Sequence, residues 1–351
     1  MAPYIISFIL SLLCMYSATK TKGKWLSLLL HILAIMPPVL LLTFRAEECG
    51  TDTTNYTRYF YALDANTFGA LLAATRLELL FSLLMYSVRS LNLSIECLFF
   101  ICGLLTIVPV YLGAMRLRGK ANPHLVMALF YLMFYQYSYN IVRQSIGMSM
   151  LFFAVVLLIE NRKVWSFVFG IIAVLFHTVA VVYFIVFFAY SLRERLSFRY
   201  FISNVILVLG LVYVSQTFFS DKIEYFEDYL ESSEKASTQY SYLVEMIINF
   251  LVVLFVWEKD TFRLKKFFVI VSGIVASVIM LGSVAPYAFR VANCIDISLL
   301  IYIPMALKST RNRGYYAIYL SFAVFFWWFV FIFNHSGRSY PYVLSNMVSF
   351  I

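Results

Sequence analysis

The sequence predicts an all-helical protein that crosses a membrane many times, as a single transmembrane domain over residues 1–351. Of the residues, 62% are hydrophobic and only 13% are charged, which is more apolar surface than a soluble domain of this size buries. Apolar stretches suited to membrane helices recur along the whole chain. The basic residues behind the net charge of +9 lie mostly in short connecting segments. That pattern is typical of cytoplasmic loops and argues against a nucleic-acid partner.

About 12 membrane-spanning helices are expected. The first two cover residues 3–17 and 25–44 and are joined by a short segment with Lys20, Lys22 and Lys24. A long polar segment over residues 45–93 follows them. The remaining expected spans are residues 94–115, 125–139, 145–159, two short spans within 164–190, then 200–219, 242–257, 267–284, 291–307 and 315–333.

Two stretches allow alternative assignments. Residues 77–88 are apolar, but a perpendicular helix needs about 20 residues to cross. We therefore expect an external, interfacial helix within the loop 45–93. Residues 164–190 could be one tilted span or a hairpin of two short spans that turns at His177. In the competing topology, residues 77–88 cross the membrane and residues 164–190 form a single span.

Charge favours the hairpin. The topology with the hairpin places 18 of the 27 basic residues on the cytoplasmic side, whereas the competing topology places 15 there. Because Lys and Arg bias sets orientation, we expect 12 spans with both termini outside. An acidic loop over residues 220–241 then lies outside as well. The same outer face would carry Arg45, Asp52, Arg143, His177 and Arg290.

A polar cluster separates two apolar stretches at Asn140, Arg143 and Gln144. Such a cluster at the end of membrane helices is costly unless it meets water, protein or a ligand. Arginine stays charged and binds phosphate oxygens in pairs. We therefore expect Arg143, with Asn140 and Gln144 beside it, to bind a lipid-linked diphosphate together with Arg290. Arg45 is a third candidate, and contact with lipid headgroups is the alternative for these arginines.

Two residues could accept a proton from a sugar hydroxyl. His177 is a candidate general base, although a buried histidine can also be satisfied by a backbone carbonyl. Asp52 lies in a hydroxyl-rich loop in which Tyr56 and Asn55 could hold a sugar; it could instead cap a turn. The sequence shows no nucleotide-binding motif, no paired metal carboxylates and no metal spacing among its five cysteines. We therefore expect neither a metal nor a cofactor.

In their order and spacing, these residues resemble the EpsG family of Wzy-type polysaccharide polymerases. The resemblance covers about residues 40–190 and rests on Arg45, Gly50-Thr51-Asp52, Asn55-Tyr56, Asn140, Arg143-Gln144 and Phe176-His177. It implies a GT-C-like, metal-independent glycosyltransferase. Such an enzyme polymerises undecaprenyl-diphosphate-linked oligosaccharide repeat units of O-antigen, capsule or exopolysaccharide. The active site would face the periplasm or cell exterior from the bacterial inner membrane.

One departure from the family stands out. The family often has Glu-Pro-Gly-Phe in the interfacial helix, whereas Glu78 is followed here by Leu79-Leu80-Phe81. This difference speaks against a role for Glu78. The expected partners are lipid-linked donor and acceptor, membrane lipid, a chain-length regulator and a flippase. Two other functions remain open: a flippase for the same lipid-linked units, and a non-catalytic partner of the export machinery.

Overall fold

The computed structural model describes residues 1–351 except 62–66, 76, 192–232, 261–262, 281–287 and 346–351. Helices joined by connecting segments form this described part, which contains no β-strand. A single isolated bridge joins Arg45 to Leu344 and brings the end of the second helix beside the C-terminal segment. The predicted all-helical fold is therefore confirmed for the described residues.

The first two helices, α1 (Ala2–Lys20) and α2 (Lys24–Thr43), form an antiparallel hairpin. The Ser11 hydroxyl donates to the Ala34 carbonyl across it at 2.5 Å. The hairpin packs along α6 (Ile95–Arg116), where Gly103 allows close approach to Val39. The outer face of α1 remains apolar and exposed, as in Ile6 and Leu13. Such a face suits contact with lipid.

The bundle is organised around α8 (Val142–Ile159), which contacts α6, α9 and α15. Before it come η1 (Leu117–Gly119), α7 (Pro123–Met133) and the 3₁₀ turn η2 (Tyr135–Tyr139). After it come α9 (Lys163–Phe176), η3 (Thr178–Val182) and α10 (Tyr183–Ser191). Ser166 of α9 contacts the Tyr183 hydroxyl, and Gly170 of α9 lies beneath the Tyr183 ring. The chain thus folds back on itself at His177, as predicted, with a short apolar helix on each side of the turn.

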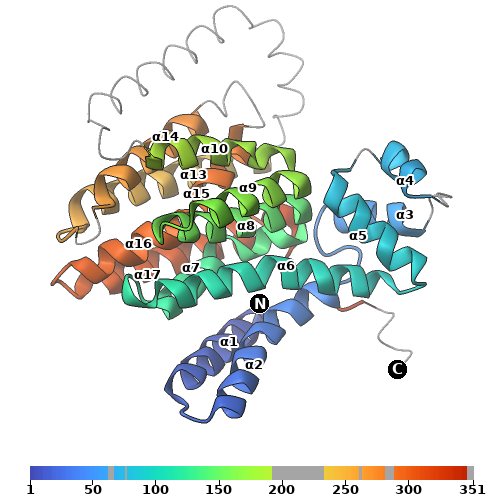
Figure 1. Cartoon of the computed structure of the whole chain (residues 1–351), viewed down its shortest axis with the longest axis horizontal. Coiled ribbons are helices and arrows are strands. Elements are labelled where there is room, and N and C mark those ends of the chain that lie inside the picture. The colour runs from blue at the N-terminus through green and yellow to red at the C-terminus, as the bar shows by residue number, and fades with distance from the viewer. Residues whose placement is uncertain (62–66, 76, 192–232, 261–262, 281–287, 346–351) are drawn as a thin grey trace, which may run out of the picture.

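The polar segment 45–93 contains three short helices rather than one: α3 (Thr53–Tyr61), α4 (Phe68–Thr75) and α5 (Leu79–Ser90). They gather at the end of the bundle where α6 begins (Figure 1). The backbone N–H of Ile95 donates to the Tyr61 hydroxyl at 3.4 Å and ties α3 to α6. Helix α5 corresponds to the interfacial helix predicted from residues 77–88.

The remaining helices complete the bundle. They are α13 (Ser233–Leu251), η4 (Val252–Val256), α14 (Lys265–Met280), α15 (Ala288–Asp296), α16 (Leu299–Ser309), α17 (Gly314–Trp327), η6 (Trp328–Phe333) and η7 (Ser336–Arg338). Of the predicted external loop 220–241, residues 233–241 belong to α13. Residues 220–232 lie outside the described part, as does the predicted span 200–219.

The described helices do not confirm the predicted number of spans. Five described helices are long and apolar enough to cross a membrane, and a sixth span arises if the pair Phe289–Asp296 and Leu299–Ser309, bent by 47°, counts as one. Other apolar stretches form helices of 10–17 residues, such as α7 and α9. An apolar stretch shows that a helix is shielded from water but not that it crosses alone. Neither 12 spans nor a GT-C-like arrangement is confirmed.

Basic connecting segments gather at one end of the bundle, which we call the basic end. The Lys308 ammonium donates to the Gly119 carbonyl at 2.8 Å, and Arg116 pairs with Glu160 at 2.5 Å. These contacts join the connections α6–α7, α8–α9 and α16–α17. Helices α6 and α8 run from this end to the opposite end, which holds α3, α4 and α5 (Figure 1).

Candidate functional site

Glu78, Arg143 and His177 meet at the end of the bundle opposite the basic end, which we call the site end. Glu78 precedes α5, Arg143 lies in the first turn of α8, and His177 forms the turn after α9. The Glu78 carboxylate bridges the other two: Oε2 pairs with Arg143 Nη1, and Oε1 lies 2.7 Å from His177 Nδ1. The Thr178 N–H also donates to Oε1 at 3.4 Å. One carboxylate therefore connects three distant segments.

The charge of Glu78 determines which nitrogen of His177 carries the proton. Burial alone would raise the pKa of Glu78, but the hydrogen bond from His177 and the charge of Arg143 lower it to about 2. Ionised Glu78 can only accept hydrogen bonds, so His177 donates through Nδ1. Nε2 is buried and has no hydrogen-bond partner among the described residues. In the neutral imidazole Nε2 then carries the lone pair, which no described residue uses.

Arg143 is held from two sides. Its Nη1 faces Glu78, and its Nε donates to the Tyr56 hydroxyl at 3.2 Å. Nη2 is used by neither partner, and the side chain remains 24% exposed. Two fixed contacts orient the guanidinium plane and leave donors for an anion such as a phosphate.

Tyr56 has a different environment from the one expected of a sugar-binding ring. It is 3% exposed, and its ring packs against Phe81 with the ring centres 5.1 Å apart. Burial raises the pKa of Tyr56 to about 12, so the hydroxyl stays neutral near pH 7. The structure therefore assigns Tyr56 a contact that orients Arg143.

Asp52 lies in the loop before α3, partly buried. Burial raises the pKa of Asp52, although the positive charges of Arg290 and Arg143 lower it in part. Asp52 is therefore within electrostatic reach of both arginines. A carboxylate with a raised pKa accepts a proton more readily near neutral pH than an exposed one does.

Asn140 holds the Asp52 loop in place. Its Oδ1 accepts from the backbone N–H of Thr51 at 2.8 Å and from the Thr51 hydroxyl at 3.3 Å. Gly50 adopts φ +98°, and a Cβ there would lie 2.1 Å from the Tyr139 carbonyl oxygen. Glycine alone allows both this conformation and this approach. Asn140, expected beside the diphosphate, contacts the loop that carries Asp52.

Gln144 and Arg290 link α8 to α15. Gln144 Nε2 donates to the Arg290 carbonyl at 2.8 Å and approaches Cys294 Sγ at 3.5 Å. Gln144 is buried, whereas Arg290 is partly exposed. Gln144 therefore positions the helix turn that carries Arg290 near Asp52.

Two predicted residues make their contacts outside this group, although the positive charge of Arg45 still acts on Asp52. Arg45 is 4% exposed, with its guanidinium carbon 4.1 Å from the Phe99 ring centre and 5.4 Å from that of Tyr139. Its Nη1 donates to the Ser138 carbonyl at 3.2 Å. Asn55 is exposed on α3 and accepts from Arg58 at 3.3 Å. The structure thus brings together Asp52, Arg143, His177 and Arg290.

Glu78 is the residue that sequence reasoning missed. The available signal was its place directly before a short apolar segment, together with the family's glutamate at that position. The missing Pro-Gly sequence after Glu78 obscured that signal, yet Glu78 still bridges Arg143 and His177. Within the described part, no group of three His, Cys, Asp or Glu residues could hold a metal ion.

Comparison with known proteins assigns the chain to a family. No curated protein matches the chain, and no solved structure matches it. The EpsG family model matches residues 28–344, well beyond the stretch on which the motif resemblance rested. The family points to a membrane protein of polysaccharide assembly. The chain belongs to the EpsG family of Wzy-type polysaccharide polymerase-like proteins.

Proposed function

We propose that this protein is a membrane glycosyltransferase that polymerises oligosaccharide repeat units carried on undecaprenyl diphosphate. One observation carries the proposal: Glu78 joins an oriented arginine to a histidine whose Nε2 has no hydrogen-bond partner among the described residues. A growing chain on lipid diphosphate would be the donor, and a new lipid-linked unit would offer the acceptor hydroxyl. Family membership supports the substrate class.

The leaving diphosphate would be stabilised by arginine. Arg143 presents Nη2, which Glu78 and Tyr56 leave unused. Arg290 adds a second positive charge near Asp52. Cations held in position before the reaction lower the barrier, because they need no rearrangement when charge develops.

The acceptor hydroxyl would lose its proton to His177 Nε2. Its oxygen forms a bond to the anomeric carbon of the donor while the bond from that carbon to the diphosphate oxygen breaks. The electron pair of the broken bond leaves with the diphosphate, and the proton remains on the imidazole until it passes to solvent. Glu78 would stabilise the imidazolium at 2.7 Å. A positioned base of this kind contributes about 10²- to 10⁴-fold.

Asp52 is the second candidate for the base, since burial raises its pKa and it lies near the same arginines. We propose that the site faces the periplasm or cell exterior of the bacterial inner membrane, where lipid-linked units are joined. A chain-length regulator and a flippase would be its partners there.

A flippase receives less support. A transporter of lipid-linked units needs cations along a path reached from both faces, whereas Arg143, Glu78 and His177 meet at one end of the helices. A non-catalytic assembly partner would not require a base with a free nitrogen.

The proposal is tested with purified protein in lipid nanodiscs supplied with lipid-linked repeat units. The measured quantities are polymer per protein molecule and diphosphate-lipid release. His177→Gln should slow both by about 10²- to 10⁴-fold, while His124→Gln, at the basic end, serves as the matched control. Polymer formation at the wild-type rate by a protein that lacks both His177 and Asp52 would rule the mechanism out.

A further inference from the structure

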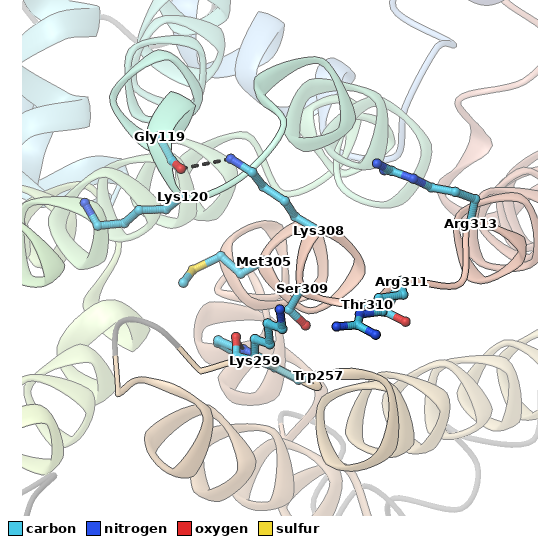
Figure 2. Close-up of a pocket in the computed structure, with 10 residues that line it drawn as sticks. All are labelled: Gly119, Lys120, Trp257, Lys259, Met305, Lys308, Ser309, Thr310, Arg311 and Arg313. Atoms are coloured by element: carbon cyan, nitrogen blue, oxygen red, sulfur yellow. Dashed lines mark hydrogen bonds between the residues drawn. The ribbon is translucent and has the colours of Figure 1, made fainter.

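A pocket of about 630 Å³ opens at the basic end, far from the candidate active site. Three connecting segments line it: those after α6, before α14, and between α16 and α17. Five basic side chains belong to its lining: Lys120, Lys259, Lys308, Arg311 and Arg313 (Figure 2). Figure 2 shows them arranged around the ends of the helices, with Lys308 extended toward Gly119.

Two carboxylates lie beside this lining, and Glu258 offsets part of its positive charge. The pKa of Glu258 is lowered by its hydrogen bond from Thr310 and by the charges of Arg311 and Lys259. Glu258 accepts from the Thr310 hydroxyl at 2.6 Å and from the Arg311 backbone N–H at 3.4 Å. Asp260 accepts from two backbone N–H groups, at 2.8 and 2.9 Å, at the start of α14. No acidic side chain lines the pocket. The side chains of Lys259, Arg311 and Arg313 form no ion pair with another residue that the structure describes.

The pocket walls are held by hydrogen bonds. Lys308 Nζ donates to the Gly119 carbonyl at 2.8 Å and joins two of the three segments. Trp257 is buried, donates through Nε1 to the Lys259 carbonyl at 3.1 Å, and its own carbonyl accepts from Lys265 Nζ at 2.5 Å. These hydrogen bonds fix the walls from which the basic side chains extend.

The ligand class follows from charge and position. The five basic side chains outnumber the two neighbouring carboxylates, and such clusters of Lys and Arg attract phosphate oxygens. The pocket lies at the ends of membrane-length helices, and Trp257 and Met305 give its wall an apolar part. Basic pockets between membrane helices are typical binding sites for anionic lipid headgroups. An ordinary basic loop differs, because it has charge but forms no pocket.

We propose that this pocket binds the phosphate groups of an anionic phospholipid, such as cardiolipin, from the leaflet at the basic end. Five basic residues around one pocket suit a headgroup with two phosphates. The apolar wall would contact the glycerol and the first acyl carbons. This binding is independent of the polymerase reaction proposed above, because it uses none of the residues at the site end.

The test compares two double variants that each lose two positive charges at the basic end. Lys259→Gln with Arg313→Gln alters the pocket, and Arg162→Gln with Lys163→Gln is the matched control outside it. Purified proteins are titrated with cardiolipin, phosphatidylcholine or inorganic diphosphate. Retained lipid is counted by native mass spectrometry, and the thermal midpoint is followed in parallel. Equal midpoints without lipid establish that both variants fold.

Wild-type protein and the control should retain cardiolipin in preference to phosphatidylcholine and gain thermal stability from it. The pocket variant should bind cardiolipin about 30-fold more weakly, since each basic residue near an anionic lipid surface adds about fivefold. Equal weakening in both variants, or no preference over phosphatidylcholine, would overturn the proposal. Displacement of the lipid by low concentrations of inorganic diphosphate would show a site for a soluble anion and overturn it too. Should the pocket variant fail to fold, Arg311→Gln alone, whose side chain has no ion pair in the described part, takes its place.

Discussion

The two ends of the bundle handle charge differently. At the site end, Glu78 contacts both Arg143 and His177, and all three side chains are largely shielded from water. At the basic end, Lys259 and Arg313 are exposed and have no ion pair with a described residue. A shielded charge needs a partner in a fixed place. A solvated charge needs no such partner, and it acts mainly through long-range electrostatic attraction of anions.

This difference has a consequence for substitutions. At the site end, a single change alters protonation or orientation of the neighbouring groups, so effects should be large and coupled. At the basic end, charges should act nearly additively on the binding of anions. The predictions below test this contrast, beginning with the largest expected effect.

The first prediction tests whether the two ends face opposite sides of the membrane. Cys14 and Cys97, which are not buried, are replaced by alanine. Single cysteines are then introduced at the exposed positions Glu48 and Lys163. Glu48→Cys should react almost completely with an impermeant thiol reagent added to intact cells, and Lys163→Cys should react only after lysis. Reaction of both cysteines from outside would show that the two ends do not face opposite sides of the membrane.

The second prediction concerns Arg143. Arg143→Ala should abolish polymer while the protein still reaches the membrane, and cells should display single repeat units. Arg143→Lys should restore little, because lysine keeps the charge but cannot contact Glu78, Tyr56 and a phosphate at once. Immunoblots give protein abundance, and gels of the extracted polysaccharide give chain length. Polymer of ordinary length from the alanine variant would remove Arg143 from the mechanism.

The third prediction separates the two candidate bases. His177→Gln should lower the rate per molecule by about 10²- to 10⁴-fold with little change in KM. Asp52→Asn should have the smaller effect if its carboxylate only contributes charge near Arg290. Steady-state rates of both purified variants decide between them. A collapsed rate in Asp52→Asn beside a normal rate in His177→Gln would transfer the base to Asp52.

The fourth prediction uses the lowered pKa of Glu78, about 2 against an ordinary 4.5. Because the folded value is the lower one, the stability from ionised Glu78 is fully present above about pH 4.5. It is lost as the pH falls toward 2. The thermal midpoint of wild type should drop between pH 5 and pH 3 by on the order of 2–4 °C more than that of Glu78→Gln. Parallel acid profiles for the two proteins would show that the Glu78 contacts add no stability.

Much of the site could be anticipated from the order of residues. The sequence alone predicts the helical membrane fold, the turn at His177 and the convergence of Asp52, Arg143 and Arg290 on one end. Hydropathy and charge are local properties that a chain displays before it folds. For the same reason, the family resemblance could be read from short motifs.

Other features depend on tertiary structure. Glu78 lies 65 residues from Arg143 and 99 from His177, and no local pattern reveals which distant carboxylate a cation meets. Packing also placed Arg45 against Phe99 and directed Asn140 to Thr51. The described helices do not confirm the predicted count of spans, because an apolar stretch can bury itself against other helices as well as against lipid. Composition thus determines which segments leave water, whereas only the packed chain decides what each polar side chain contacts.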